Sequence, residues 1–166
     1  MALTKVSVAL LLAVFLAAAA APASAASAAC RRKITVQNLS GRDLMLTLEP
    51  LANSPHLWGG AGYMLHHGSH AEFSICLGWT GRLHAPEAPT AEFHVGHDGG
   101  AWYMAPVGQS GPVHVTVTPH TDRAFGGLQG HCPAVGCANN GQCFAHAVPG
   151  GNCANVDELK IIYYSP

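Results

Sequence analysis

Histidine is the most frequent side chain in this sequence that could bind a metal or titrate near neutral pH. Of the eleven histidines, His66, His67 and His70 lie in one short segment, and His94 and His97 lie at the end of an alternating stretch. A metal site needs three or four converging ligands, and residues three apart on a strand point to opposite faces. We therefore predict solvated loop histidines without a metal or cofactor. The alternative is a surface that becomes positively charged in acid.

Serine and glycine patterns do not indicate a catalytic or phosphate-binding motif. Ser69 and Ser74 lack the G-x-S-x-G context of a serine nucleophile. Gly126, Gly127 and Gly130 lack the strand–loop–helix setting of a phosphate-binding loop. These glycines are therefore predicted to be turn residues.

Four aromatic side chains lie in or beside glycine-rich turns, where a ring can stack on a sugar or cap a hydrophobic core. Burial is the more common outcome for tryptophan. Both outcomes stay open for Trp58, whereas Trp79 and Trp102 are expected in the core. Tyr103 is kept as a residue that could contact a sugar.

Residues 1–25 have the features of a secretory signal peptide. Lys5 precedes the apolar run Val6–Ala21, and the small residues at 23–25 offer a cleavage site. No second apolar stretch of about 20 residues follows, so we predict no membrane span. Residues 26–166 are expected to form one domain of a secreted, extracellular chain. Within this domain, Asn38 begins a sequon that permits N-glycosylation.

All six cysteines lie in the expected mature chain, and an even number in an exported protein favours three disulfides. The alternative is a zinc site, but Cys132, Cys137 and Cys143 lack the close C-x2-C spacing of structural zinc. The segment 132–153 is rich in small residues and is predicted to be a loop held by crosslinks. The cysteines are Cys30, Cys76, Cys132, Cys137, Cys143 and Cys153.

Alternation of apolar and polar residues predicts short strands separated by glycine- and proline-rich breaks. No segment keeps a helical apolar period for three turns, so we predict an all-β chain that forms an antiparallel β-sandwich. Nine acidic residues against eight lysines and arginines exclude a basic nucleic-acid-binding protein. The alternating stretches are Lys33–Leu39, Leu44–Leu48, His70–Leu77, Glu92–Val95, Val113–Thr118 and Leu159–Tyr164.

Five short segments and a cysteine series occur in an order typical of one protein family. They are residues 34–38 (ITVQN), 78–83 (GWTGRL), 90–93 (TAEF), 102–103 (WY) and 115–119 (VTVTP), with Cys132, Cys137, Cys143 and Cys153. Over nearly the whole mature chain this order resembles the thaumatin-like family of secreted plant defence proteins, which implies a β-sandwich core. Full-length members carry a second disulfide-rich region before the last strand, and this chain has no counterpart between Cys153 and Leu159.

The resemblance also implies where crosslinks lie. Family members join the first strand to the C-terminus by a disulfide, and this chain has Ser40 and Ser165 at the matching positions. Joint loss of both partners is expected of a real pair, because one orphan thiol is a liability in an oxidising compartment. We therefore predict that these two serines are neighbours. The resemblance further implies a Cys143–Cys153 bridge, and it leaves Cys132 and Cys137 to pair with each other or with Cys30 and Cys76.

Glycan-directed members of this family present an acidic cleft with one arginine, one glutamate and several aspartates. The resemblance assigns Arg82 and Glu92 to the first two positions, but Met104 stands where an aspartate would be. A glycosidase needs two facing carboxylates, and the sequence near Glu92 offers only Glu87 and Asp98. We therefore predict that Glu92 is a surface or hydrogen-bonded strand residue and that the chain is not an enzyme.

These observations lead to one functional hypothesis and two alternatives. The resemblance implies a monomeric, defence-related protein, secreted to the apoplast or cell wall, that binds extracellular glycan or a microbial surface without cleaving it. Arg82, Glu92, Trp58 and Tyr103 are the residues expected to contact the glycan. The alternatives are a β-1,3-glucan hydrolase and an extracellular protein-binding or inhibitor module that uses the segment 132–153.

Overall fold

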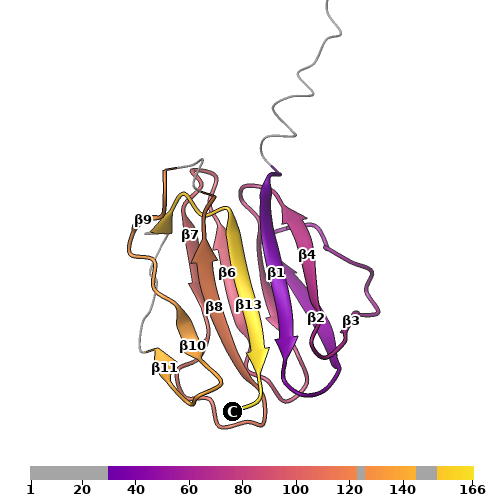
Figure 1. Ribbon diagram of the computed structural model, residues 1–166. Helices are drawn as coiled ribbons and strands as arrows, with labels where there is room; N and C mark the ends of the chain where they lie inside the picture. The colour runs from indigo at the N-terminus through magenta and orange to yellow at the C-terminus, as the bar shows by residue number, and fades with distance from the viewer. Residues whose placement is uncertain (1–29, 123–125, 145–152) are drawn as a thin grey trace, which may run out of the picture.

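The computed structural model describes residues 30–122, 126–144 and 153–166, so the expected signal peptide lies outside the described residues. The described residues form strands and loops without a helix, in two sheets that make two layers (Figure 1). The expected all-β sandwich is therefore confirmed. Within these residues, no helix offers the length and hydropathy needed to cross a membrane.

Two sheets account for all the strands in the described residues, and we name each by its number of strands. The six-stranded sheet contains, in spatial order, β11 (Cys143–Phe144), β10 (Val135–Cys137), β8 (His114–His120), β13 (Glu158–Tyr164), β1 (Arg32–Leu39) and β4 (His70–Ile75). The seven-stranded sheet contains β3 (Tyr63–Leu65), β2 (Leu44–Leu51), β5 (Thr80–His84), β6 (Ala91–Val95), β7 (Ala101–Met104), β12 (Cys153–Ala154) and β9 (Gln129–Gly130).

The alternating sequence pattern decides which face of each strand points into the core. In β2 Leu44, Leu46 and Leu48 are buried, while Met45 and Glu49 face outward. Buried residues of both sheets contact one another in a single hydrophobic cluster. Fully burying one such side chain contributes about 1.5–3 kcal/mol, so a shift of register by one residue would be strongly unfavourable. The same register therefore also determines which side chains lie on the outer faces.

The first and last strands are neighbours and run parallel, which the expectation of a purely antiparallel sandwich did not include. Their ladder runs from Lys33 opposite Glu158 to Leu39 opposite Tyr164, and Figure 1 shows the indigo β1 beside the yellow β13. Ser40 and Ser165 directly follow the last pair of this ladder. The register therefore supports the prediction that these two serines lie side by side.

All six cysteines are paired, but the implied Cys143–Cys153 bridge is wrong. Cys143 lies on β11 of the six-stranded sheet and Cys153 on β12 of the seven-stranded sheet, so the two residues belong to different layers. Cys143 instead faces Cys137 across the β10–β11 ladder and bonds to it. The alternatives left open for Cys132 and Cys137 are also corrected, because the other bridges are Cys132–Cys153 and Cys30–Cys76.

Candidate functional site

A row of three charged side chains crosses the outer face of the seven-stranded sheet. Arg82 on β5 is opposite Glu92 on β6 and also opposite Glu49 on β2. The Nε of Arg82 donates to Oε2 of Glu92 at 2.7 Å, and its Nη1 lies 3.6 Å from Oε2 of Glu49. We call Glu49, Arg82 and Glu92 the Arg82 row. Sequence analysis had named Arg82 and Glu92, and the structure brings them into direct contact.

The Arg82 row is partly shielded from water at one end. The Glu92 side chain is only 16% exposed, whereas those of Arg82 and Glu49 are 41% and 49% exposed. The hydrogen bond to Glu92 and the charge of that carboxylate raise the pKa of Arg82, which keeps its guanidinium group charged. A charge-assisted bond of this kind fixes the geometry of both groups, although exposed pairs add little to stability. The expectation that Glu92 is a hydrogen-bonded strand residue is therefore confirmed.

A histidine extends the hydrogen-bonding surface next to the Arg82 row. Nε2 of His84 lies 3.3 Å from Oε2 of Glu49, and its Nδ1 lies 3.0 Å from Oγ1 of Thr90. His84 precedes the turn that joins β5 to β6, so the same hairpin carries Arg82 and His84. These side chains give the face several donors and acceptors at fixed positions.

An aromatic ring and a thioether lie on the other side of the Arg82 row. On β7, Ala101 and Tyr103 are buried, so Trp102 and Met104 face outward. Met104 is opposite Glu92, and Trp102 is opposite His94. Trp102 is half-buried, which corrects the expectation that it belongs to the core. The outer face therefore combines a flat apolar surface with the polar groups of the Arg82 row.

This combination of groups suits the binding of a sugar better than the cleavage of a glycosidic bond. The C–H face of a sugar ring packs against an aromatic side chain, and its hydroxyl groups bond to carboxylates and to guanidinium. A glycosidase needs two carboxyl groups with room for the scissile bond and, in inverting enzymes, a water molecule between them. Between Glu49 and Glu92 that space is occupied by the guanidinium of Arg82.

Two other residues expected at the glycan site lie elsewhere. Tyr103 is fully buried and donates from its hydroxyl group to the carbonyl oxygen of Pro133 at 2.7 Å, so its assignment as a contact residue is wrong. Burial raises the pKa of Tyr103 strongly. Trp58 packs against Tyr63 and Phe73, with ring centroids 5.7 and 4.7 Å away, and rests on the edge of the core. It does not adjoin the Arg82 row.

The expected core position of Trp79 agrees with the structure. Its ring is buried, stacks on Phe93 with centroids 5.2 Å apart, and donates from Nε1 to the carbonyl oxygen of Pro55 at 2.9 Å. Trp79 thus fastens the loop after β2 to the core of the sandwich.

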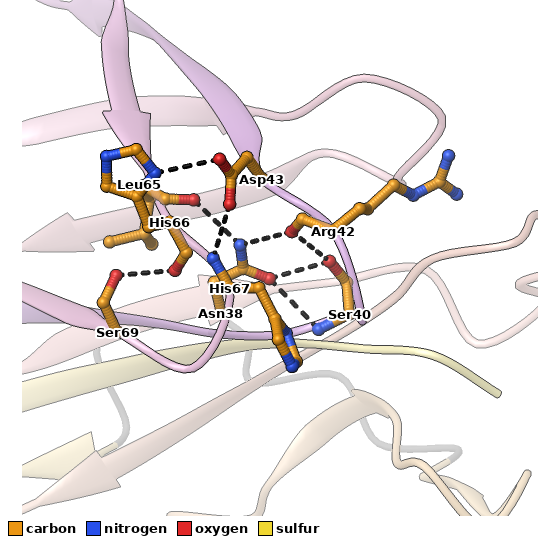
Figure 2. Close-up of polar contacts among 8 residues, drawn as sticks. All are labelled: Asn38, Ser40, Arg42, Asp43, Leu65, His66, His67 and Ser69. Atoms are coloured by element: carbon orange, nitrogen blue, oxygen red, sulfur yellow. Dashed lines mark hydrogen bonds and ion pairs between the residues drawn. The ribbon is translucent and has the colours of Figure 1, made fainter.

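The sequon residue Asn38 belongs to a buried hydrogen-bond network. Its side chain is fully buried, and its Nδ2 donates to the carbonyl oxygens of Arg42 and Leu65 at 2.7 and 2.8 Å. Its Oδ1 accepts hydrogen bonds from the backbone nitrogen and the hydroxyl group of Ser40 (Figure 2). A sugar on Nδ2 would remove a buried donor from this network, so glycosylation of Asn38, which the sequon permits, would cost the native fold a hydrogen bond.

Two of the clustered histidines hold the loop beside Asn38. Oδ1 of Asp43 accepts a hydrogen bond from the backbone nitrogen of His67 at 2.9 Å, and Oδ2 of Asp43 lies 2.9 Å from Nδ1 of His66 (Figure 2). These contacts, the backbone bond first, hold the pKa of Asp43 below its usual range. Nδ1 of His67 also accepts from the backbone nitrogen of Gly41 at 3.0 Å. The cluster therefore links two loops of the fold.

Sequence analysis missed Glu49 as a partner of Arg82. It considered the carboxylates near Glu92 in sequence, but Glu87 pairs with Arg42, and Asp98 accepts a hydrogen bond from the backbone nitrogen of Gly100. The signal that could have found Glu49 is the alternation of β2, which continues past Leu48 and puts Glu49 on the outer face. The pairing of β2 with β5, however, cannot be predicted from the sequence of either strand alone.

The outer face of the six-stranded sheet carries a second charged group. Nζ of Lys33 lies 2.9 Å from Oε1 of Glu72 and 3.7 Å from Oε1 of Glu158, and the hydroxyl group of Thr35 donates to Glu158. We call Lys33, Glu72 and Glu158 the Lys33 group. A hollow of about 290 Å³ lies over it, lined by Lys33, Thr35, Gln37, His70, Glu72, Glu158 and Lys160. None of these lining residues is a phenylalanine, tyrosine or tryptophan.

Comparisons with known proteins do not assign this chain to a family. No protein-family model and no curated protein matches the sequence. Among solved structures, the chain is similar to the crystal structure of the protein elicitor MoHrip2 from Magnaporthe oryzae, with 13% sequence identity and a TM-score of 0.47. The matched region covers 81% of this chain and 98% of that chain.

Proposed function

We propose that this chain is a secreted, thaumatin-like binding protein that holds extracellular or cell-wall glycan on the outer face of its seven-stranded sheet and does not cleave it. The observation that carries the proposal is the Arg82 row lying beside the outward-facing Trp102. Three neighbouring strands supply the charged groups, and the next strand supplies the ring, so the surface is rigid before a ligand arrives. Such preorganisation lowers the entropic cost of binding.

The absence of cleavage follows from what lies between the two carboxylates. Arg82 bonds to Glu92 and lies close to Glu49, so its guanidinium group fills the space between the two acids that a scissile bond would need. Acid catalysis of glycoside hydrolysis needs one protonated and one ionised carboxyl group. The Arg82 row instead offers fixed acceptors and donors for sugar hydroxyl groups.

Two further observations support secretion and the thaumatin-like relationship. Three disulfides are typical of chains that fold in an oxidising compartment, which agrees with the signal peptide expected at residues 1–25. The parallel ladder of β1 with β13 ends at Leu39 opposite Tyr164, one residue before Ser40 and Ser165, and this supports the lost disulfide that the family resemblance implies there. The Cys137–Cys143 and Cys132–Cys153 bridges differ from the implied pattern, so the relationship rests on the strands.

Sedimentation with insoluble β-1,3-glucan tests the proposal. The oxidised mature protein is mixed with the polysaccharide at neutral and mildly acidic pH, and the bound and free fractions are compared. We expect retention that survives moderate salt, because the ring contact is apolar, together with no release of reducing sugar. Absence of retention at both pH values would remove the glucan-binding function, and release of reducing sugar would favour the hydrolase.

A further inference from the structure

All three methionines in the described residues lie on the outer face of the seven-stranded sheet. Met45, Met64 and Met104 expose 39%, 45% and 46% of their surface, although methionine is usually among the more buried residue types. Met45 on β2 is directly opposite Met64 on β3, and Met104 on β7 is opposite Glu92. The sheet therefore presents thioethers on both sides of the Arg82 row.

These thioethers lie outside the core. None of the three methionines belongs to the hydrophobic cluster between the sheets. The sulfur of Met45 covers the backbone of Gly62, where a Cβ atom would lie only 2.9 Å from Sδ. The φ of Gly62 is +88°, a backbone conformation that favours glycine. Adding an oxygen atom to these sulfurs therefore changes the surface and leaves the packing of the core as it is.

We infer that Met45, Met64 and Met104 are modification sites for peroxide, and that sulfoxide formation at Met104 weakens glycan binding beside it. The inference rests on the proposed function. A sulfur lone pair attacks one oxygen of hydrogen peroxide, the O–O bond breaks and hydroxide leaves. The proton on the oxygen that stays on sulfur then passes to the hydroxide, which gives the sulfoxide and water. The sulfur is oxidised by two electrons, and the peroxide is reduced to water.

Among the sulfur atoms of the described residues, the exposed thioethers are expected to react most readily with peroxide. All six cysteines are in disulfides, so no thiol among the described residues competes for the oxidant. Susceptibility to oxidation follows exposure, and the three exposures are similar. Because Met104 is opposite Glu92 and next to Trp102, its sulfoxide puts a polar group where the face had been apolar. Methionine sulfoxide reductases reverse the change.

The experiment treats the mature protein with dilute hydrogen peroxide and follows three readouts. Peptide mass spectrometry counts oxygen atoms on each methionine, thermal unfolding reports the fold, and sedimentation with β-1,3-glucan reports binding. We expect all three methionines to be oxidised at similar rates with an unchanged unfolding midpoint. Glucan affinity is expected to fall by about fivefold, because a polar sulfoxide replaces apolar contact area.

Two variants separate the effect of oxidising Met104 from the effect of oxidising the other two methionines. Each variant is compared with itself before and after peroxide, so its own starting affinity does not matter. The M104L protein is expected to keep its affinity after treatment, whereas the M45L/M64L protein is expected to lose affinity as the unmodified chain does. Equal losses in both variants would overturn the role of Met104.

The failure of the proposed function and the failure of this inference give different results. If the untreated protein does not bind glucan, the proposed function fails, and mass spectrometry and unfolding still decide whether the three methionines are modification sites. Oxidation that occurs only after unfolding, or that lowers the unfolding midpoint, would overturn the inference even where untreated protein binds glucan.

Discussion

The two outer faces of the sandwich carry similar charges but differ in what surrounds them. On the six-stranded sheet Lys33 lies between Glu72 and Glu158, and on the seven-stranded sheet Arg82 lies between Glu92 and Glu49. Both cations have raised pKa values because a glutamate accepts a hydrogen bond from each. A cation between two carboxylates is thus a recurring surface feature of this fold and does not by itself mark a site.

The difference lies in the apolar groups beside each cation. The hollow over the Lys33 group is lined by polar and charged side chains, and Thr35 already donates to Glu158. The Arg82 row instead adjoins Trp102 and the exposed Met104. Replacing water by sugar hydroxyls around such polar groups changes the binding free energy little, because each hydrogen bond to sugar replaces one to water. An aromatic ring gains by burial, which is why we assign binding to the seven-stranded sheet.

The largest effect is expected where the end of β1 lies beside the C-terminal end of β13 on the six-stranded sheet. Replacing Ser40 and Ser165 together with cysteine should close a disulfide, because the parallel ladder brings these positions together. A crosslink over so long a loop stabilises by up to about 5 kcal/mol in the chain-entropy model, less the hydroxyl contact of Ser40 with Asn38. Thiol titration measures whether the disulfide has formed, and urea unfolding measures the change in the free energy of unfolding. Glucan binding should not change, and two free thiols in the folded double variant would refute the pairing.

The second effect concerns the ring that distinguishes the two faces. Trp102→Ala should lower glucan affinity about tenfold or more, because the sugar loses the apolar surface that it buries. Tyr164→Ala is the matched control, since Tyr164 is a half-buried aromatic residue on the outer side of β13 in the other sheet. Sedimentation with β-1,3-glucan measures both variants. A larger loss in Tyr164→Ala than in Trp102→Ala would move the site to the six-stranded sheet.

A third, smaller effect compares the two cations directly. Arg82→Leu should lower glucan affinity by about fivefold, because Glu92 and Glu49 lose the group that orients them and a donor to sugar hydroxyls is removed. Lys33→Leu removes the equivalent charge from the other face and should leave binding unchanged. Equal losses in the two variants would mean that overall charge, and not the Arg82 row, controls binding.

The smallest effect is expected at Asp43, which lies on neither outer face and should influence stability alone. The fold lowers the pKa of Asp43 from its ordinary value of 3.8, so its carboxylate stabilises the native state above that value. This contribution is lost as the pH falls through the lowered pKa. Asp43→Asn should therefore be less stable than the parent chain at neutral pH, with a smaller difference at about pH 3. Urea unfolding at the two pH values tests this, and a constant difference would contradict it.

The strands could be predicted from the sequence because their signal is local. Alternation at Leu44, Leu46 and Leu48 specified a half-buried strand, and Val115 and Val117 specified another. These patterns follow from side-chain direction, which repeats every two residues. Which strands become neighbours depends on contacts across the whole chain, so alternation alone did not indicate the parallel β1–β13 pair. Only the expected contact of Ser40 with Ser165 pointed to the first and last strands as neighbours.

Only part of the candidate site could be predicted from the sequence, because the pairing of distant strands is not a local signal. Arg82 and Glu92 come from one hairpin and were named together, whereas Glu49 and Trp102 join them only through the pairing of separate strands. The sequon at Asn38 was misleading, because the amide group that could carry a glycan is the group that the fold buries.

The central claim is that glycan binds the outer face of the seven-stranded sheet, and nuclear magnetic resonance tests it most directly. A soluble β-1,3-glucan oligosaccharide is titrated into isotope-labelled mature protein while side-chain signals of both faces are followed. We expect the largest shifts at the indole N–H of Trp102 and the Nε–H of Arg82, with little change at Thr35 or Lys33. Shifts confined to the six-stranded sheet, or no shifts at saturating oligosaccharide, would contradict the account.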